Sequence, residues 1–352
     1  WRRLCVKGYT QAQRQYDPDR VKYPMRRTNP EKGRGIDPGF VPISWDEAIQ
    51  IIADQLKYTI DTYGNEAIYR TYGSGMYSVT GNPSDRLLNI LGGRLNPLYD
   101  YSTHMLQCVM TYMYGSSDNL DDDGNHKTLG VPATAFSPYD ATNASSMTEA
   151  ERASDLVVMF GNSPAETRMG GANIVWDFAR VREAVQKRGG RIINIDYRLN
   201  ETSSGHSDEW LPIRPGTDLA MMLAVAQVLY EEDLIDHEFV EQWVEPTGFE
   251  EWRAYVMGEG EDGIKKTPEW AAPICAVPAD TIREFARLYG TTKPVHLQYF
   301  YSCAKRHMGD YSAIASMLLQ AMTGNIACPG GCESGACLPT PGRIPAPWAD
   351  WH

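Results

Sequence analysis

Residues 156–160 read Leu-Val-Val-Met-Phe, and the next four, Gly161-Asn162-Ser163-Pro164, are typical of a turn. An unbroken apolar run of this length indicates a strand that is buried on both faces, as strands of parallel sheets are. A helical pattern over residues 171–188 follows, and a second apolar strand is predicted at Ile192–Ile195. This strand–helix–strand order predicts an α/β fold with a mostly parallel, doubly wound sheet.

Further along the chain, the same alternation continues. We expect an amphipathic helix at residues 217–232, helices at 280–289 and 310–323, and a strand at Val295–Tyr301. Residues 116–150 are rich in Asp, Asn, Ser and Thr and predict a long surface loop. In sheets of this kind, ligands bind beyond the carboxyl ends of the strands, so the residues there are the first candidates for a site.

The N-terminal part has a different pattern. Residues 1–43 are basic and rich in Pro and Gly, which predicts irregular structure. Ser44 and Glu47 form a capping box, and the helix that it opens is expected to end at Gly64. A short strand is expected at residues 67–71.

The composition excludes several classes of protein. The 352 residues suggest two or three domains, and a content of 42% hydrophobic and 22% charged residues is that of a globular protein. The formal net charge of −12 argues against a nucleic-acid partner, which would require a basic face. No apolar run of about 18 residues occurs, so no membrane span is predicted. Because the chain opens on Trp1 rather than Met, we expect a fragment of a longer protein.

Seven cysteines are an odd number in a long chain and do not suggest a disulfide scaffold. Three of them, Cys328, Cys332 and Cys337, lie close together, but their spacing is irregular for a zinc site. Incidental thiols are the favoured interpretation, and a metal or cluster role is the alternative.

Polar residues follow the predicted strands in three places: Gly161–Arg168, Asp196–Arg198 and Ile213–Asp218. An Asp at a strand end can accept hydrogen bonds from a ribose or a purine, and a helix N-terminus favours phosphate. Taken singly, each residue is equally typical of a helix cap or a turn. The G-x-G-x-x-G fingerprint of NAD sites is absent.

Several ordered stretches together carry a family resemblance. They are Cys5–Gly8, Tyr16–Met25, Ile43–Ala48, Asp100-Tyr101-Ser102, Phe160–Arg168, Ile213–Asp218 and Thr323-Gly324-Asn325. With these stretches the sequence resembles the N-terminal half of the dimethyl sulfoxide reductase family, the bis(molybdopterin guanine dinucleotide) oxidoreductases. Within that family, it resembles the catalytic subunits of the anaerobic membrane-complex type.

The resemblance implies roles near the metal centres. Ser102 falls on the protein ligand to molybdenum, where a hard oxygen donor suits the metal. Cys5 falls on the last of four cysteines of a [4Fe-4S] cluster, and Lys7 on a basic residue between cluster and pterin. Tyr77, with Ser102 and Lys7, completes the implied catalytic set. His104 is either close to the metal site or a buried structural histidine.

The same resemblance assigns the cofactor-binding residues. They are Tyr77, Ser78, Val79, Thr80, Gly81, Gly161, Asn162, Ser163, Asp196, Tyr197, Gly216, Thr217, Asp218, Ser302, Cys303 and Arg306. The chain departs from the family at Ser302–His307, where relatives read Trp-Gly-Pro-Gln-Arg-His, at Tyr197, where they have Pro, and at Met76–Val79, where they have a Gly-rich run. These departures leave the substrate open.

The activity implied is two-electron reduction of an S-oxide or N-oxide by oxygen-atom transfer in anaerobic respiration. Alternatives are a reductase or dehydroxylase of another organic substrate, a non-catalytic electron-carrier scaffold, and a plain nucleotide-binding α/β domain. The implied partners are an iron–sulfur electron-transfer subunit and a membrane anchor subunit. The protein would then be membrane-associated through them, after export by a twin-arginine signal that this chain lacks.

The expected domain division follows from the same comparison. Residues 1–43 would be a remnant of the iron–sulfur cluster domain, and 44–112 the first part of an α/β domain with the molybdenum ligand. Residues 113–340 would form the dinucleotide-binding α/β domain for one pterin guanine dinucleotide. Residues 341–352 would begin a missing continuation, so the fragment would lack the C-terminal pterin-binding domain.

Overall fold

The computed structural model divides the protein into two compact units, Trp1–Leu98 and Tyr99–His352. It describes residues 6–71, 83–95, 109, 113, 147–167, 174–299, 303 and 305–332. The four-part domain division expected from the sequence stays a prediction.

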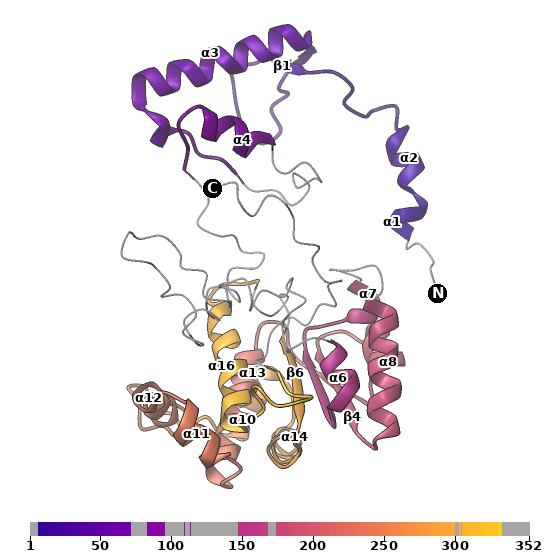
Figure 1. Cartoon of the computed structure of the whole chain (residues 1–352), viewed down its shortest axis with the longest axis vertical. Helices are drawn as coiled ribbons and strands as arrows, with labels where there is room; N and C mark the ends of the chain where they lie inside the picture. Colours follow the sequence, from indigo (N-terminus) through magenta and orange to yellow (C-terminus); the bar gives the residue numbers. More distant parts are fainter. Residues whose placement is uncertain are drawn as a thin grey trace. The chain divides into compact units, whose positions relative to one another are not determined.

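The first unit contains one long helix and several short elements (Figure 1). Its elements are α1 (Val6–Tyr9), α2 (Gln11–Gln15), the antiparallel pair β1 (Met25–Arg27) and β2 (Phe40–Pro42), α3 (Trp45–Tyr63), the 3-10 helix η1 (Asn65–Ala67) and α4 (Pro83–Ile90). Between these elements the described part of residues 1–43 is irregular, as expected.

Both predicted ends of α3 are confirmed. The Ser44 hydroxyl accepts a hydrogen bond from the Glu47 amide at 3.1 Å, and Gly64 ends the helix with a φ of +81°. The strand predicted at residues 67–71 is wrong. The Ala67 amide donates back to the Gly64 carbonyl and closes a 3-10 turn, and among the described residues this segment forms a single isolated bridge, between Tyr69 and Leu95.

The second unit is built on a four-stranded sheet in the order β5-β4-β3-β6. The strands are β3 (Leu156–Phe160), β4 (Arg191–Asp196), β5 (Glu209–Pro212) and β6 (Val295–Tyr299), and all neighbours are parallel. β3 is buried throughout, as its sequence predicted. β5 was missed because only Trp210 and Leu211 give it an apolar pattern.

Helices cover both faces of this sheet (Figure 1). Val157 and Met159 pack under α6 and α8, whereas Leu156, Val158 and Phe160 face the other helical layer. The prediction of a doubly wound α/β sheet is thereby confirmed. The helices are α6 (Met147–Ala153), α7 (Pro164–Thr167), α8 (Ile174–Lys187), α9 (Glu201–Gly205), α10 (Asp218–Glu231), α11 (His237–Trp243), α12 (Pro246–Met257), α13 (Pro268–Cys275), α14 (Ala279–Thr291) and α16 (Gly309–Met322).

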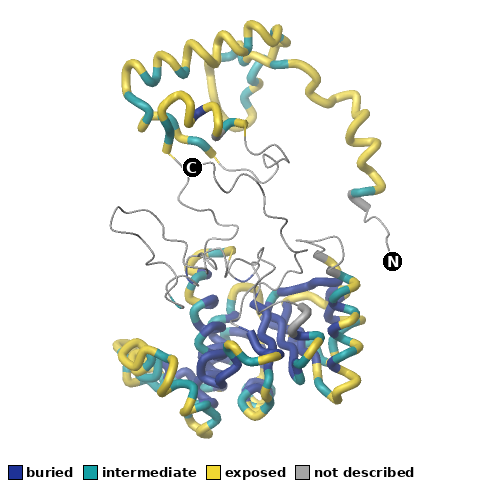
Figure 2. The backbone as a smooth tube through the Cα atoms, viewed as in Figure 1, coloured by how far each residue is buried: buried dark blue, intermediate teal, exposed yellow. Residues whose placement is uncertain are grey.

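The structure corrects two details of the predicted elements. The helix α10 is not amphipathic, because it packs against α13, α14 and α16 and 11 of its 14 residues are buried (Figure 2). The loop predicted at residues 116–150 ends too late, since α6 already begins at Met147. Within the described ranges, no helix combines the length and the apolar character that a membrane span requires.

Candidate nucleotide-binding edge of the sheet

The strand order places a switch point between β3 and β6. The chain leaves β3 toward β4 and β5 on one side and returns to β6 on the other, so the carboxyl ends of β3 and β6 are adjacent. Open α/β sheets bind ligands at such points because the connections diverge there and leave a crevice. The candidate site is therefore the carboxyl edge of this sheet.

Asn162, just beyond β3, lies at this switch point and is 2% exposed. Its side-chain amide donates a 2.6 Å hydrogen bond to the side-chain oxygen of Gln298 in β6. Gln298 is fully buried and was missed by sequence reasoning. The available signal was a glutamine inside an otherwise apolar strand, since a buried amide requires hydrogen-bond partners.

The rest of the loop after β3 is fixed by α9. The hydroxyls of Ser163 and Thr202 are 2.9 Å apart, and Thr202 also accepts from the Ala165 amide at 3.1 Å. Gly161 has a φ of +56°, and its amide donates to the Ile195 carbonyl. A left-handed residue at this place favours glycine, and it turns the backbone across the strand ends.

Asp196 is the last residue of β4, and its carboxylate is nearly buried. One oxygen accepts from the Arg198 amide at 3.2 Å and the other from the Asn200 side chain at 2.9 Å. Burial raises the pKa of this carboxyl above its usual range, although the bonds from Arg198 and Asn200 oppose the shift. The next residue, Tyr197, exposes its ring to solvent.

The Arg198 side chain is held by an ion pair with Glu166. Its guanidinium donates to both carboxylate oxygens of Glu166, at 2.8 and 2.7 Å. Asn200, which sequence reasoning also missed, caps α9 through the Ser203 amide while it holds Asp196. The polar side chains at the end of β4 are therefore held in place by hydrogen bonds to one another.

The third segment leads into α10. Asp218, 5% exposed, opens this helix, and its carboxylate lies 3.2 Å from the Arg306 guanidinium and 3.3 Å from the Cys303 thiol, which donates to it. Thr217 does not cap the helix with its hydroxyl, which donates to the Arg214 carbonyl instead. The first-turn amides of α10 thus lack a side-chain cap at the end where a helix favours anions.

Arg306 lies directly over the Gly216 turn. Gly216 has a φ of +84°, and a Cβ there would come within 2.8 Å of the nearer terminal nitrogen of Arg306. That nitrogen is buried and makes no hydrogen bond to the described part of the chain. The other terminal nitrogen donates to Ser312 at 2.8 Å.

The predicted site residues divide into two groups. The structure brings Gly161, Asn162, Ser163, Asp196 and Tyr197 to the carboxyl edge, and it joins Asp218 to Cys303 and Arg306 in one cluster beside Gly216 and Thr217. Cys303 is buried, and its contact with this cluster is the hydrogen bond that its thiol donates to the Asp218 carboxylate. Several other predicted residues fall outside the described ones: Cys5, Tyr77, Ser78, Val79, Thr80, Gly81, Ser102, His104, Arg168 and Ser302. Lys7 lies in α1, and its side chain is likewise undescribed.

Two of the three clustered cysteines, Cys328 and Cys332, lie within the described ranges. Cys332 is buried, and its thiol donates to the Leu297 carbonyl at 3.0 Å. Cys328 is a free thiol, and Cys337 lies outside the described residues. No group of three or more possible metal ligands occurs in the described ranges.

Comparison with known proteins identifies the family. The profile of molybdopterin oxidoreductases matches residues 20–319. The chain belongs to the molybdopterin oxidoreductase family. It is 38% identical to dimethyl sulfoxide reductase DmsA of Escherichia coli K12, over 39% of that protein and 95% of this chain. It is 33% identical to a dimethyl sulfoxide/trimethylamine N-oxide reductase of Cereibacter sphaeroides, over 37% of that protein and 90% of this chain.

The fold agrees with this membership. Acetylene hydratase of Pelobacter acetylenicus superposes with a TM-score of 0.62 at 23% identity, over 38% of that protein and 93% of this chain. The chain thus spans about two fifths of the length of the relatives it matches.

Membership of the family implies a molybdenum–molybdopterin cofactor, and the residues at the carboxyl edge fit one. Arg306 presents a buried nitrogen that lacks a hydrogen-bond partner in the described structure. Gly216 has no side chain, so its backbone can lie close to this nitrogen. A guanidinium suits a phosphate, because its N–H groups donate charge-assisted hydrogen bonds to the phosphate oxygens. Arg306 as a donor, with the polar side chains of Asn162, Asp196 and Asp218 nearby, suits a phosphorylated pterin or its nucleotide.

Proposed function

We propose that this chain is part of a molybdenum-dependent reductase of S-oxides or N-oxides, acting in anaerobic respiration. The observation that carries the proposal is the polar carboxyl edge of a molybdopterin oxidoreductase sheet. Asn162 lies just after β3, Asp196 ends β4, and Asp218 opens the helix that follows β5. Relatives at 33–38% identity bear the names of dimethyl sulfoxide and trimethylamine N-oxide reductases.

The cofactor form that we propose is bis(molybdopterin guanine dinucleotide). Asp196 and Asp218 offer carboxylate acceptors to the N–H groups of a guanine or to ribose hydroxyls, and the Asn162 amide lies beside them at the switch point. The uncapped first turn of α10 and the Arg306 guanidinium favour the diphosphate. A single continuous groove for the dinucleotide stays a prediction.

The reaction depends on residues that lie outside the described ranges. When bound, the molybdenum centre supplies two-electron oxygen-atom transfer. We propose that Ser102 ligates the metal through its side-chain oxygen and that Tyr77 borders the substrate pocket. Cys5, with three cysteines of the longer protein, would hold a [4Fe-4S] cluster, and Lys7 would place a positive charge between cluster and pterin.

The proposed partners are an iron–sulfur electron-transfer subunit and a membrane anchor subunit, which would make the complex membrane-associated. Export by a twin-arginine signal belongs to the same proposal. Separation of membrane and soluble fractions of the native host, with detection of the full-length protein, tests this part. Recovery of the protein alone in the soluble fraction would contradict it.

The activity is tested on the full-length protein, purified without oxygen and supplied with a reduced viologen dye. We expect oxidation of the dye by dimethyl sulfoxide or trimethylamine N-oxide, together with stoichiometric molybdenum. Reaction with catechols alone would favour the dehydroxylase alternative, which the departure at Ser302–His307 supports. Iron without molybdenum would favour an electron-carrier scaffold.

A further inference from the structure

The thiol of Cys303 joins the loop that follows β6 to the first residue of α10. Cys303 is 6% exposed, and its thiol donates a hydrogen bond of 3.3 Å to the carboxylate of Asp218, which lies 85 positions earlier in the sequence. The family pattern Trp-Gly-Pro-Gln-Arg-His has Gly at this position, so the thiol is a departure of this chain from its relatives. The role of the thiol therefore has to be inferred from its contacts in this structure.

The Asp218 carboxylate is held through both of its oxygens. Oδ1 accepts from the Cys303 thiol, and Oδ2 lies 3.2 Å from the Arg306 guanidinium. Asp218 is 5% exposed, and a buried carboxylate requires donors or cations in place of the water that it loses. A carboxylate oxygen has two lone pairs, so Oδ1 can accept a second hydrogen bond. Cys303 and Arg306 thus orient the carboxylate and leave it able to accept from a ligand.

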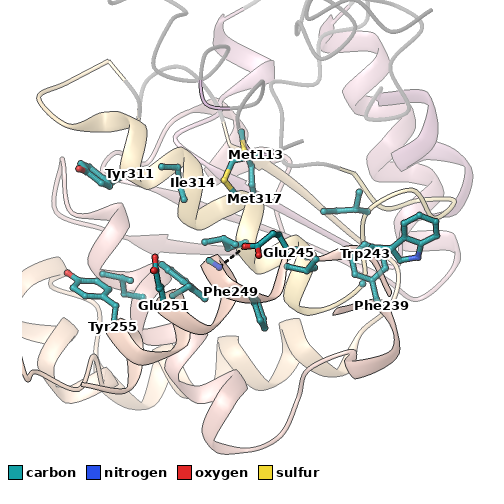
Figure 3. A pocket seen from close by; sticks show the side chains of 18 of the residues that line it. Met113, Phe239, Trp243, Glu245, Phe249, Glu251, Tyr255, Tyr311, Ile314 and Met317 are labelled. Atoms are coloured by element: carbon teal, nitrogen blue, oxygen red, sulfur yellow. Dashed lines mark hydrogen bonds between the residues drawn. The ribbon is translucent and has the colours of Figure 1, made fainter. Parts of the chain in front are cut away.

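Cys303 and Asp218 share a buried environment with Tyr299, the last residue of β6. Burial, and then the neighbouring Cys303 and Asp218, raise the pKa of the Tyr299 hydroxyl well above its usual range. This hydroxyl donates to the Gly309 carbonyl at 3.4 Å. Neither Cys303, Asp218 nor Arg306 lines the apolar groove between α12 and α16 that Figure 3 shows, so a ligand in that groove would not meet the thiol. Enclosed side chains are closely packed, which suits the thiol to holding the carboxylate in one orientation.

We propose that Cys303 is a positioning residue for the nucleotide of the cofactor. Its thiol holds the Asp218 carboxylate in the orientation that accepts from the N–H groups of the guanine. This inference rests on the proposed function, because Asp218 meets a guanine only if the dinucleotide lies at this edge of the sheet. Arg306 supplies the positive charge beside the same carboxylate, and its other terminal nitrogen is left for a phosphate. Cys303 thus acts on the nucleotide through Asp218.

The full-length protein, purified with its cofactor and dialysed, tests the proposal through the guanine nucleotide that acid releases per protein. Cys303→Ala removes the donor, and we expect the nucleotide content to fall about tenfold, as for the loss of a hydrogen bond to a charged group. Cys303→Ser keeps a donor and should retain the nucleotide within about twofold of the parent. Cys303→Gly introduces the residue of the relatives, which also lacks the donor, and should lose as much as Cys303→Ala. Thermal unfolding of each variant shows whether it is folded.

Cys332→Ala is the matched control. Cys332 is also buried, and its thiol also donates a hydrogen bond, to the Leu297 carbonyl at 3.0 Å. We expect this variant to lose about as much stability as Cys303→Ala and to keep its nucleotide.

The proposal is overturned if Cys303→Ala keeps its nucleotide, or if Cys303→Ser or Cys332→Ala loses as much as Cys303→Ala does. Failure of both Cys303→Ala and Cys303→Gly to fold would also overturn it, because the thiol would then be a structural requirement. A parent protein that releases guanine nucleotide in these cases leaves the proposed cofactor form intact. A parent that releases none contradicts that form, and the role of Cys303 with it.

Discussion

The side-chain amide of Asn162 donates a 2.6 Å hydrogen bond to Gln298, and this bond links the two strands that flank the switch point of the sheet. The two residues are 136 positions apart in the sequence, and both are almost completely buried. The bond fixes the orientation of the Asn162 side-chain amide. A residue of β6 thereby positions a residue that follows β3.

Replacement of Gln298 by Met should impair cofactor retention. The variant keeps the side-chain volume but leaves a buried amide nitrogen unpaired, at a cost of about 1–3 kcal/mol. We expect molybdenum and acid-released guanine nucleotide per protein to fall about tenfold. The control Gln227→Met alters a buried glutamine of α10 that bonds to Glu231, and it should retain both. Equal retention in the two variants would show that Gln298 has no positioning role.

The sequence alone predicted the parts of this site that depend on local pattern. Leu156–Phe160 could be recognised because a strand buried on both faces is apolar throughout. Asn162, Asp196 and Asp218 could be expected at one edge because each follows a β-strand or opens a helix, and parallel strands end at the same edge. The structure places Asn162 and Asp196 at that edge and joins Asp218, at the start of α10, to Cys303 and Arg306.

Features that depend on strand order could not be predicted in this way. No local sequence pattern shows that β6 lies beside β3, so the hydrogen bond between Asn162 and Gln298 could not be predicted. The burial of α10 depends on three helices that pack around it, and a helix shows an amphipathic stripe only if one of its faces meets water. Asn200 resembles an ordinary helix cap, and its second bond to Asp196 appears only in three dimensions.

Replacement of Ser102 by Ala in the full-length protein tests the proposed metal ligand. It removes one oxygen donor and leaves the sulfur ligands of the pterin in place. We expect near-complete loss of oxide reduction while most of the molybdenum is retained, measured by dye oxidation and metal analysis. Full activity would show that Ser102 is not the ligand, and joint loss of activity and cofactor would indicate a folding role.

Replacement of Gly216 by Ala should displace Arg306. A Cβ at this position would come within 2.8 Å of the guanidinium, and the φ of +84° adds backbone strain. The control Gly189→Ala has the same kind of strain, with a φ of +77°, but its Cβ would meet nothing within 4 Å. We expect both variants to lose stability, by about 1 kcal/mol in the control, and only Gly216→Ala to lose bound nucleotide. Normal nucleotide content in Gly216→Ala would exclude Arg306 from the site.

His206 should make the stability of the second unit depend on pH. Burial, and then the positive charge of Arg182, lower the pKa of its imidazole below the usual 6.5, while Glu201 opposes the shift. Its ring packs edge-on against Phe178, with centroids 6.1 Å apart. As the pH falls below 6.5, the unfolded chain binds a proton that the folded chain binds only at lower pH. Stability is therefore full above pH 6.5 and decreases below it.

His206→Gln should accordingly reduce the difference in Tm between pH 7.5 and pH 5.0, because glutamine does not titrate. The matched control His237→Gln alters an exposed histidine that contacts Asp233 through one ring nitrogen. Thermal unfolding of the three proteins at both pH values makes the comparison. If the control reduces the difference as strongly as His206→Gln does, the pH dependence does not arise from the burial of His206 against Phe178.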